Sequence, residues 1–214
     1  MTTPFRATAL IAAATLLVSV RSSRSQESKT AGPPLPFVVE DACPFEGCVF
    51  RSWVVGRRVA VRVQRSKTAP IAFTVNRWDW VRAVTGVFIN YQPALVRFTR
   101  DTQIPVARRK GDTLQILEYI GEGFGTIWFD GHIVENADLS RIYNGVCQDR
   151  PAACDGHIER PGRGEWWVQV ENADGVLGWT DDTDAFGNKD AYGGSWQEQM
   201  PRYKAPQRRP RIRR

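Results

Sequence analysis

The sequence predicts an all-β protein built from short strands. Aromatic and β-branched residues dominate its apolar runs, and this composition favours strands over helices. Several runs place an apolar residue at every second position, as at Val59, Val61 and Val63. Loops that contain glycine or proline, such as residues 64–70, separate these runs at close spacing, which is typical of a small sandwich or barrel.

The clearest strand signal is a tryptophan-rich hairpin. The run 165–171 leads into a turn over Asn172–Gly175, and a returning run ends at Trp179. Strand alternation places Trp166 and every second residue after it on one face, and Trp167 on the other. We expect Trp166 and Trp179 to lie in the core, and Trp167 to face outward.

The remaining strand signals divide the chain into two tandem barrels. Apolar bursts over residues 37–100 predict a first, degenerate β-barrel module. The pattern restarts in residues 101–195, where the turn at Gly111-Asp112 precedes an alternating strand and a glycine-rich loop follows at 121–125. A polar excursion over residues 135–164 interrupts this second barrel and carries two cysteines, so we expect a disulfide-bearing insertion there.

The first residues have the pattern of a secretory signal. One arginine precedes an uncharged apolar run at residues 7–20, and a series of small residues follows, so we expect cleavage after Ser25. The alternative is an uncleaved anchor, although the run is shorter than the roughly 20 residues that a spanning helix needs. Residues 26–36 are polar and then proline-rich, as in a linker. The sequence therefore predicts a secreted or periplasmic protein.

Four cysteines form two local pairs in the sequence, and export makes disulfides the expected state. Four cysteines allow three connectivities, of which we expect the two short bridges, Cys43–Cys48 and Cys147–Cys154. The alternative is a zinc site that combines these thiols with His132 or His157. Zinc ligand pairs usually stand closer in sequence than Cys147 and Cys154 do, so no metal is expected.

The net charge of +6 comes from the two ends of the chain. Removing the three positive charges before residue 26 and the seven after residue 201 leaves −4 for residues 26–201. We expect residues 196–214 to form a basic disordered tail. The tail can attract an anionic surface through counterion release, or it can simply remain solvated. No motif for specific nucleic-acid recognition accompanies it.

Parts of the second half resemble the bacterial Src-homology-3-like domain family. The matching features are Gly111-Asp112 before an alternating strand, the run Trp167-Val168-Gln169-Val170, and the closing Gly178-Trp179. Residues 52–90 look like a sister module that lacks the closing Gly-Trp, and the excursion 135–164 departs from the family pattern. The resemblance implies small barrels that bind peptides or cell-wall material without catalysis.

Two tryptophans are the candidate ligand-binding residues. If Ile127 faces the core, alternation turns Trp128 outward together with Asp130. With Trp167 also outward and Phe124 at the rim, the aromatic rings could form a stacking platform for a sugar ring or a proline. The alternative is that the insertion or the other module covers these rings.

No catalytic set or cofactor motif is visible. The acidic run 181–190 approaches the spacing of a calcium loop, but Phe186 occupies a ligand position and Gly193 replaces the closing glutamate, so a solvated turn is expected. Gly194-Ser195-Trp196 lacks the following glycine of a nucleophile elbow. The sequence predicts a non-enzymatic module that binds a peptide or a cell-envelope polymer. The alternatives are a structural or protein-interaction module of the envelope, and a small secreted hydrolase whose site is not recognisable.

Overall fold

The computed structural model describes residues 32–142, 147 and 150–192, and in this part of the chain the protein is all-β. The predicted signal (1–25), most of the linker (26–36) and the basic tail (196–214) lie outside the described residues. Among the described residues, no helix combines the length and apolarity that crossing a membrane requires.

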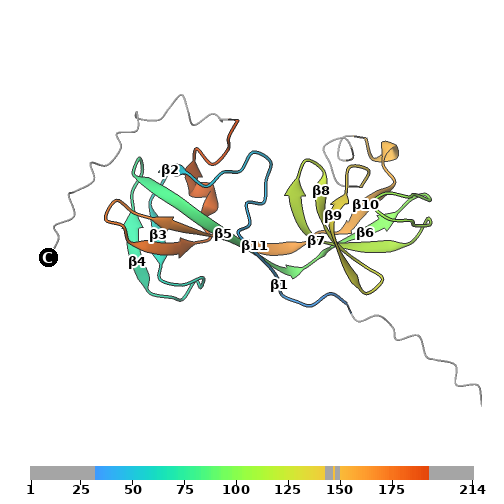
Figure 1. The fold of residues 1–214 in the computed structure, drawn as a ribbon, viewed down its shortest axis with the longest axis horizontal. Coiled ribbons are helices and arrows are strands. Elements are labelled where there is room, and N and C mark those ends of the chain that lie inside the picture. The colour runs from blue at the N-terminus through green and yellow to red at the C-terminus, as the bar shows by residue number, and fades with distance from the viewer. Residues whose placement is uncertain (1–31, 143–146, 148–149, 193–214) are drawn as a thin grey trace, which may run out of the picture. The chain divides into compact units, whose positions relative to one another are not determined.

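The strands form two antiparallel sheets (Figure 1). The eight-stranded sheet contains β1 (Phe37–Glu40), β2 (Ser52–Val55), β3 (Val59–Arg62), β4 (Ile71–Val75), β5 (Trp80–Gln92), β11 (Arg163–Glu171), β12 (Leu177–Thr180) and β13 (Phe186–Gly187). The five-stranded sheet contains β6 (Ala94–Phe98), β7 (Thr113–Gly121), β8 (Phe124–Phe129), β9 (His132–Asp138) and β10 (Gly156–Arg160). Two short 3₁₀ turns, η1 (Pro151–Ala153) and η2 (Thr183–Ala185), complete the elements.

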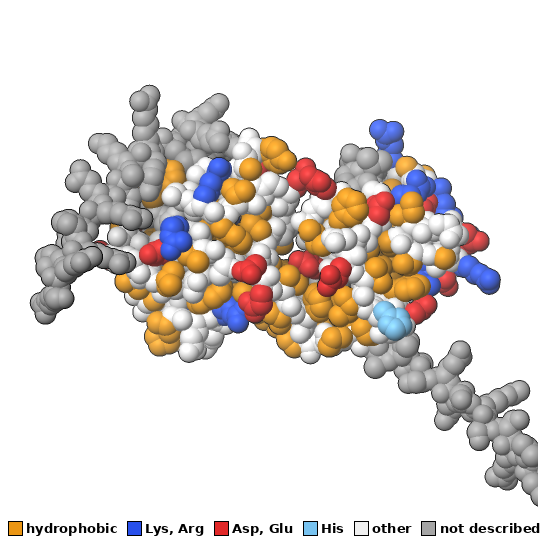
Figure 2. Space-filling model, viewed as in Figure 1, with side chains coloured by type: hydrophobic (Ala, Val, Ile, Leu, Met, Phe, Trp, Pro, Cys, Tyr) orange, Lys and Arg blue, Asp and Glu red, His pale blue; other side chains and the backbone are white. Residues whose placement is uncertain are grey.

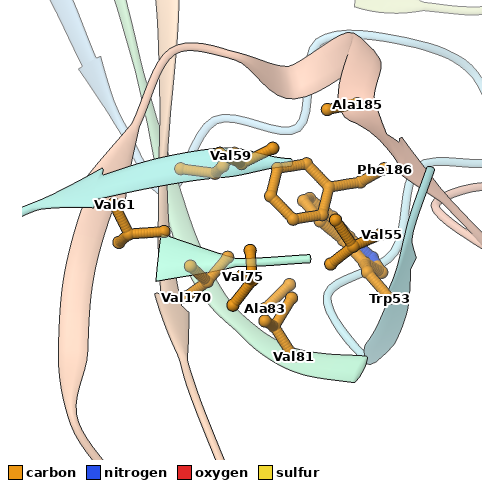
Figure 3. Packing of buried hydrophobic residues seen from close by; sticks show 11 residues of the cluster. Trp53, Val55, Val59, Val61, Val75, Val81, Ala83, Val170, Ala185 and Phe186 are labelled. Atoms are coloured by element: carbon orange, nitrogen blue, oxygen red, sulfur yellow. The ribbon is translucent and has the colours of Figure 1, made fainter. Parts of the chain in front are cut away.

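The eight-stranded sheet runs in the order β13-β2-β5-β11-β12-β3-β4, and β1 pairs with β5. Its strands curl around one apolar cluster, in which Trp53 and Phe186 are almost fully buried and their ring centroids lie 5.8 Å apart (Figure 3). Alternate valines of β3 and β11 supply much of the remaining packing. The expected alternation in the tryptophan hairpin is confirmed, because Val168 and Val170 are buried in this cluster and Trp166 packs against it.

The five-stranded sheet runs in the order β10-β6-β7-β8-β9 and has its own core. Strands β6 to β9 and the segment that follows β9 supply the buried residues of this core. They are Val96, Phe98, Leu114, Ile116, Ile127, Ala137, Leu139 and Ile142. The core lies entirely between residues 94 and 158 once its partly buried neighbours are included. Each sheet therefore buries a separate set of side chains.

The two sheets do not follow one another along the chain, and the predicted division into modules 37–100 and 101–195 is wrong. Strand β11 pairs with β5 over nine positions, and β12 meets β3 at Trp179 and Arg62. The tryptophan hairpin thus completes the first sheet, because its apolar face matches the core that β2, β3 and β5 leave open. The five-stranded sheet is inserted between β5 and β11.

This arrangement also separates the features that carried the family resemblance. The Gly111-Asp112 turn precedes β7 in the five-stranded sheet, whereas Trp167 and the closing Gly178-Trp179 belong to β11 and β12 in the other sheet. The all-β class is confirmed. The tandem order is replaced by a nested one, and the Src-homology-3-like character of the two sheets remains an expectation.

Both expected disulfides are present, Cys43–Cys48 before β2 and Cys147–Cys154 beside η1. No free cysteine occurs among the described residues. Two bridges of this kind fit an oxidising compartment. Each closes a short loop, which restricts the unfolded chain more than the folded one.

Candidate functional site

The structure buries Trp167, which the sequence analysis placed on an open face. The residue is only 2% exposed, so it cannot contact a ligand without rearrangement, and its expected role in ligand binding is contradicted. Alternation was correct, because Trp167 does point away from the cluster that contains Val168. The error concerns what covers the second face of β11.

A salt-bridged carboxylate bonds to the indole of Trp167. Lys67, between β3 and β4, lies 3.0 Å from a Glu165 carboxylate oxygen and 3.2 Å from an Asp181 oxygen. Glu165 also accepts a hydrogen bond from the Trp167 indole nitrogen at 3.2 Å. The contact with Lys67 lowers the pKa of Glu165, so this carboxylate remains charged over Trp167. In the same loop, the Arg65 guanidinium lies over the ring of Trp179, which is half-buried rather than a core residue.

Trp128 lies on the outer face of the five-stranded sheet. Its neighbours along β8, Ile127 and Phe129, face the core cluster, so alternation directs Trp128 away from that core. The side chain is half-buried. The outward orientation expected for Trp128 is therefore confirmed.

The residues paired with Trp128 extend this face across the sheet. Register places Gln115 of β7 and Ile133 of β9 directly opposite Trp128, and Leu95 of β6 opposite Gln115. Ile133 is 41% exposed. We call the row Leu95, Gln115, Trp128 and Ile133 the Trp128 row. In Figure 2, hydrophobic and acidic side chains both reach the surface of the described residues.

Two glutamates stand next to the Trp128 row. Thr126, two residues before Trp128 on the same face, donates a hydrogen bond of 3.3 Å to Glu118, its partner on β7. Burial raises the pKa of Glu118, the bond from Thr126 offsets part of this effect, and the charge of Glu135 on β9 raises the pKa further. The outer face thus places a partly buried carboxylate and a second carboxylate beside an indole ring.

The other two predicted site residues lie at opposite ends of β8. Phe124 is 42% exposed and faces outward, because Gly125 turns toward Leu139 of the core. It borders an open hollow of about 350 Å³ together with Ile120. Asp130, after the other end of the strand, is 71% exposed and forms an ion pair of 3.3 Å with Arg108. Phe124 and Trp128 therefore share one face of β8. Asp130 directly follows this strand, where Arg108 fixes its carboxylate.

The side chains of the acidic run 181–190 are directed to separate partners. Asp182 pairs with Arg57, Asn188 donates to the Ser52 carbonyl at 2.7 Å, and Asp190 accepts from a backbone N–H at 2.8 Å. The described residues contain no group of three or more histidines, cysteines, aspartates or glutamates that could hold a metal ion. The run is therefore not the solvated turn that the sequence predicted, because it contains η2 and β13 and buries Ala185 and Phe186 in the core of the eight-stranded sheet.

Gln115, Glu118, Ile133 and Glu135 were not among the residues singled out from the sequence. Each belongs to a strand whose alternation was readable, but only the register of β7 and β9 against β8 brings them beside Trp128. Register depends on pairing across the sheet, and sequence periodicity alone does not specify it.

Fold and site together define an all-β, disulfide-bonded protein with an aromatic and acidic sheet face. Comparisons with models of protein families, with curated proteins and with solved structures found no match.

Proposed function

We propose that this chain is an exported, non-enzymatic binding module that holds a peptide or cell-envelope polymer on the outer face of its five-stranded sheet. Trp128 is the central contact, with Phe124 farther along the same strand. The observation that carries the proposal is the outward orientation of Trp128 on β8. This strand is paired with β7 on one side and with β9 on the other, so it holds the ring rigidly. Rings presented in this way offer a large contact area at a low cost in conformational entropy.

The surroundings of Trp128 favour binding over a purely structural role. A partly exposed indole between Gln115 and Ile133 leaves apolar surface in water, and such surface commonly marks an interaction site. Glu118 and Glu135 supply hydrogen-bond acceptors beside it. Asp130 forms an ion pair with Arg108, so we assign it to the edge of the binding face rather than to its centre.

The test is co-sedimentation of the full chain with purified cell-wall sacculi. Trp128→Ala is expected to weaken binding about tenfold, which corresponds to roughly 1.4 kcal/mol of lost stacking and apolar contact. Tyr192→Ala is the matched control, since it removes a 77% exposed aromatic ring from a turn outside both sheets. Trp167 is unsuitable for this purpose because truncating a buried ring would disturb the fold.

Salt separates this proposal from charge-driven adhesion. Stacking on Trp128 is expected to persist at moderate ionic strength, whereas attraction through the tail 196–214 is screened. Binding that disappears in salt and is insensitive to Trp128→Ala would contradict the proposal. Binding to a protein component rather than to the polymer would favour the interaction-module alternative, and release of soluble wall fragments would favour the hydrolase.

A further inference from the structure

The carboxylates beside Trp128 have no cation of their own. In the part of the chain that the structure describes, no lysine or arginine forms an ion pair with Glu118 or Glu135. Elsewhere in the same sheet, carboxylates are neutralised, as Arg97 pairs with Glu159 and Arg108 with Asp130. The partly buried Glu118 and the exposed Glu135 repel one another, because the charge of Glu135 disfavours the charged form of Glu118.

A positively charged ligand would relieve this repulsion. A primary ammonium group can donate hydrogen bonds to both glutamate carboxylates, and an aromatic ring nearby adds an attraction of its own to a cation or to the C–H surface that carries it. The Trp128 row provides such a ring next to Glu118 and Glu135. The chemistry of the face therefore matches an apolar ring that bears amines and hydroxyls.

The position of Trp128 within the sheet argues for a sugar rather than an extended peptide. Strand β8 is hydrogen-bonded on one side to β7 and on the other to β9, so its backbone groups are not open to an added peptide strand. A pyranose ring needs only the side-chain surface, on which it can stack against the indole while its substituents reach Glu118 and Gln115.

Resting on the binding role proposed above, we infer that the outer face of the five-stranded sheet recognises a polysaccharide with free amino groups, through stacking on Trp128 and ion pairing with Glu118 and Glu135. The amine supplies the missing cation, and the sugar ring covers the exposed indole. An N-acetylated sugar would retain the ring but lose the charge.

Calorimetric titration of the full chain with three soluble probes tests this inference. The probes are a glucosamine hexamer, an N-acetylglucosamine hexamer and a lysine hexapeptide. The glucosamine hexamer is expected to bind about tenfold or more tightly than the N-acetylated one, and the double variant Glu118→Gln/Glu135→Gln should remove this preference. Trp128→Ala should weaken both hexamers.

Matched variants keep the test independent of folding defects. The glutamine substitutions preserve size and hydrogen-bonding capacity, and near-ultraviolet circular dichroism verifies that each variant retains its packing. Glu40→Gln is the charge control, because it removes an exposed carboxylate from β1 in the other sheet. It should leave the affinity for the glucosamine hexamer unchanged.

The outcomes distinguish this inference from the function on which it rests. Equal affinity for both hexamers, unaffected by the double variant, would overturn the role of the amine while leaving the Trp128 face as a binding site. Preference for the lysine hexapeptide, lost in Trp128→Ala, would overturn the sugar and favour a peptide ligand. Sacculus binding that is insensitive to Trp128→Ala would reject the proposed function itself.

Discussion

Asp155 holds the excursion between β9 and β10 in place. Its carboxylate is 5% exposed and accepts bonds from the Arg141 guanidinium at 2.6 and 2.9 Å and from the Thr102 hydroxyl at 2.8 Å. Arg100 is the third partner, and its Nε lies 3.5 Å from the Asp155 carboxylate. The residue follows Cys154, so the ion pairs and the disulfide fix the same segment.

Replacing Asp155 by asparagine is expected to lower the free energy of unfolding by about 2 kcal/mol near neutral pH, since it removes a buried charged acceptor from the Thr102 hydroxyl and from Arg141, which is itself about half exposed. The bond from Arg141 lowers the pKa of Asp155 in the folded state. Stabilisation is therefore complete above the unfolded-state pKa, about 3.9, and is lost as the pH falls through the lower folded-state value. Urea unfolding of both proteins from about pH 7 down to pH 2 measures this difference.

Asp174→Asn is the appropriate control for this substitution. Asp174 lies exposed in the turn between β11 and β12, and in the described chain no cation pairs with its side chain. Its replacement should change stability by less than about 0.5 kcal/mol. A pH-independent loss in the Asp155 variant would indicate that packing, rather than charge, is responsible.

The contrast between Trp128 and Trp167 shows what the sequence could and could not predict about the site. Both residues point away from the core of their own sheet, as alternation required. Trp167 is nevertheless buried, and its indole nitrogen donates a hydrogen bond to Glu165, which Lys67 reaches from a loop about a hundred residues earlier in the chain. Periodicity is a local property, whereas cover by a distant loop depends on tertiary contacts that the sequence pattern does not encode.

The tryptophan hairpin was predictable as an element, although its partners were not. Residues 165–179 gave the expected strands, and Gly175 has the positive φ of +81° that its turn requires. The closing Gly178 explains why β12 can dock on β3. A Cβ at this position would lie 2.6 Å from Val61 Cγ1 and 2.9 Å from the Arg62 carbonyl oxygen.

Gly178→Ala is expected to destabilise the eight-stranded sheet by about 1–3 kcal/mol, because the added methyl group forces β12 away from a packed strand. Denaturant unfolding followed by tryptophan fluorescence measures the loss. Gly32→Ala provides the control, since a Cβ there meets no atom within 4 Å. Unchanged stability in Gly178→Ala would show that β12 can shift without cost and that the close approach has no structural role.

At the level of the whole chain, one sheet interrupts the other. Strands β1 to β5 and β11 to β13 build the eight-stranded sheet, and everything between them belongs to the five-stranded sheet. Strand signals and their approximate limits were readable from composition and alternation. The nested order was not, because antiparallel pairing of β5 with β11 joins segments separated by about seventy residues, and periodicity carries no information about which strands pair.

The nested order predicts where the chain can be divided. Gln92 and Arg163 are cross-strand partners at the ends of β5 and β11, so an Asn-Gly turn joining them should close a hairpin and preserve the eight-stranded sheet without residues 93–162. The excised segment 93–162 retains all five strands of its sheet, every buried member of its core and the Cys147–Cys154 bridge.

Both products are expected to fold, as judged by dispersed amide resonances and cooperative thermal unfolding, and segment 93–162 should retain the Trp128 row. A division after residue 100 is expected to fail, because residues 101–195 lack β6 from one sheet and the partners β3 and β5 from the other. At about 70 residues, the excised segment is close to the size at which one core suffices, so its disulfide should be kept oxidised. Cooperative folding of 101–195, with collapse of the Asn-Gly-joined protein, would contradict the nested arrangement and restore two consecutive modules.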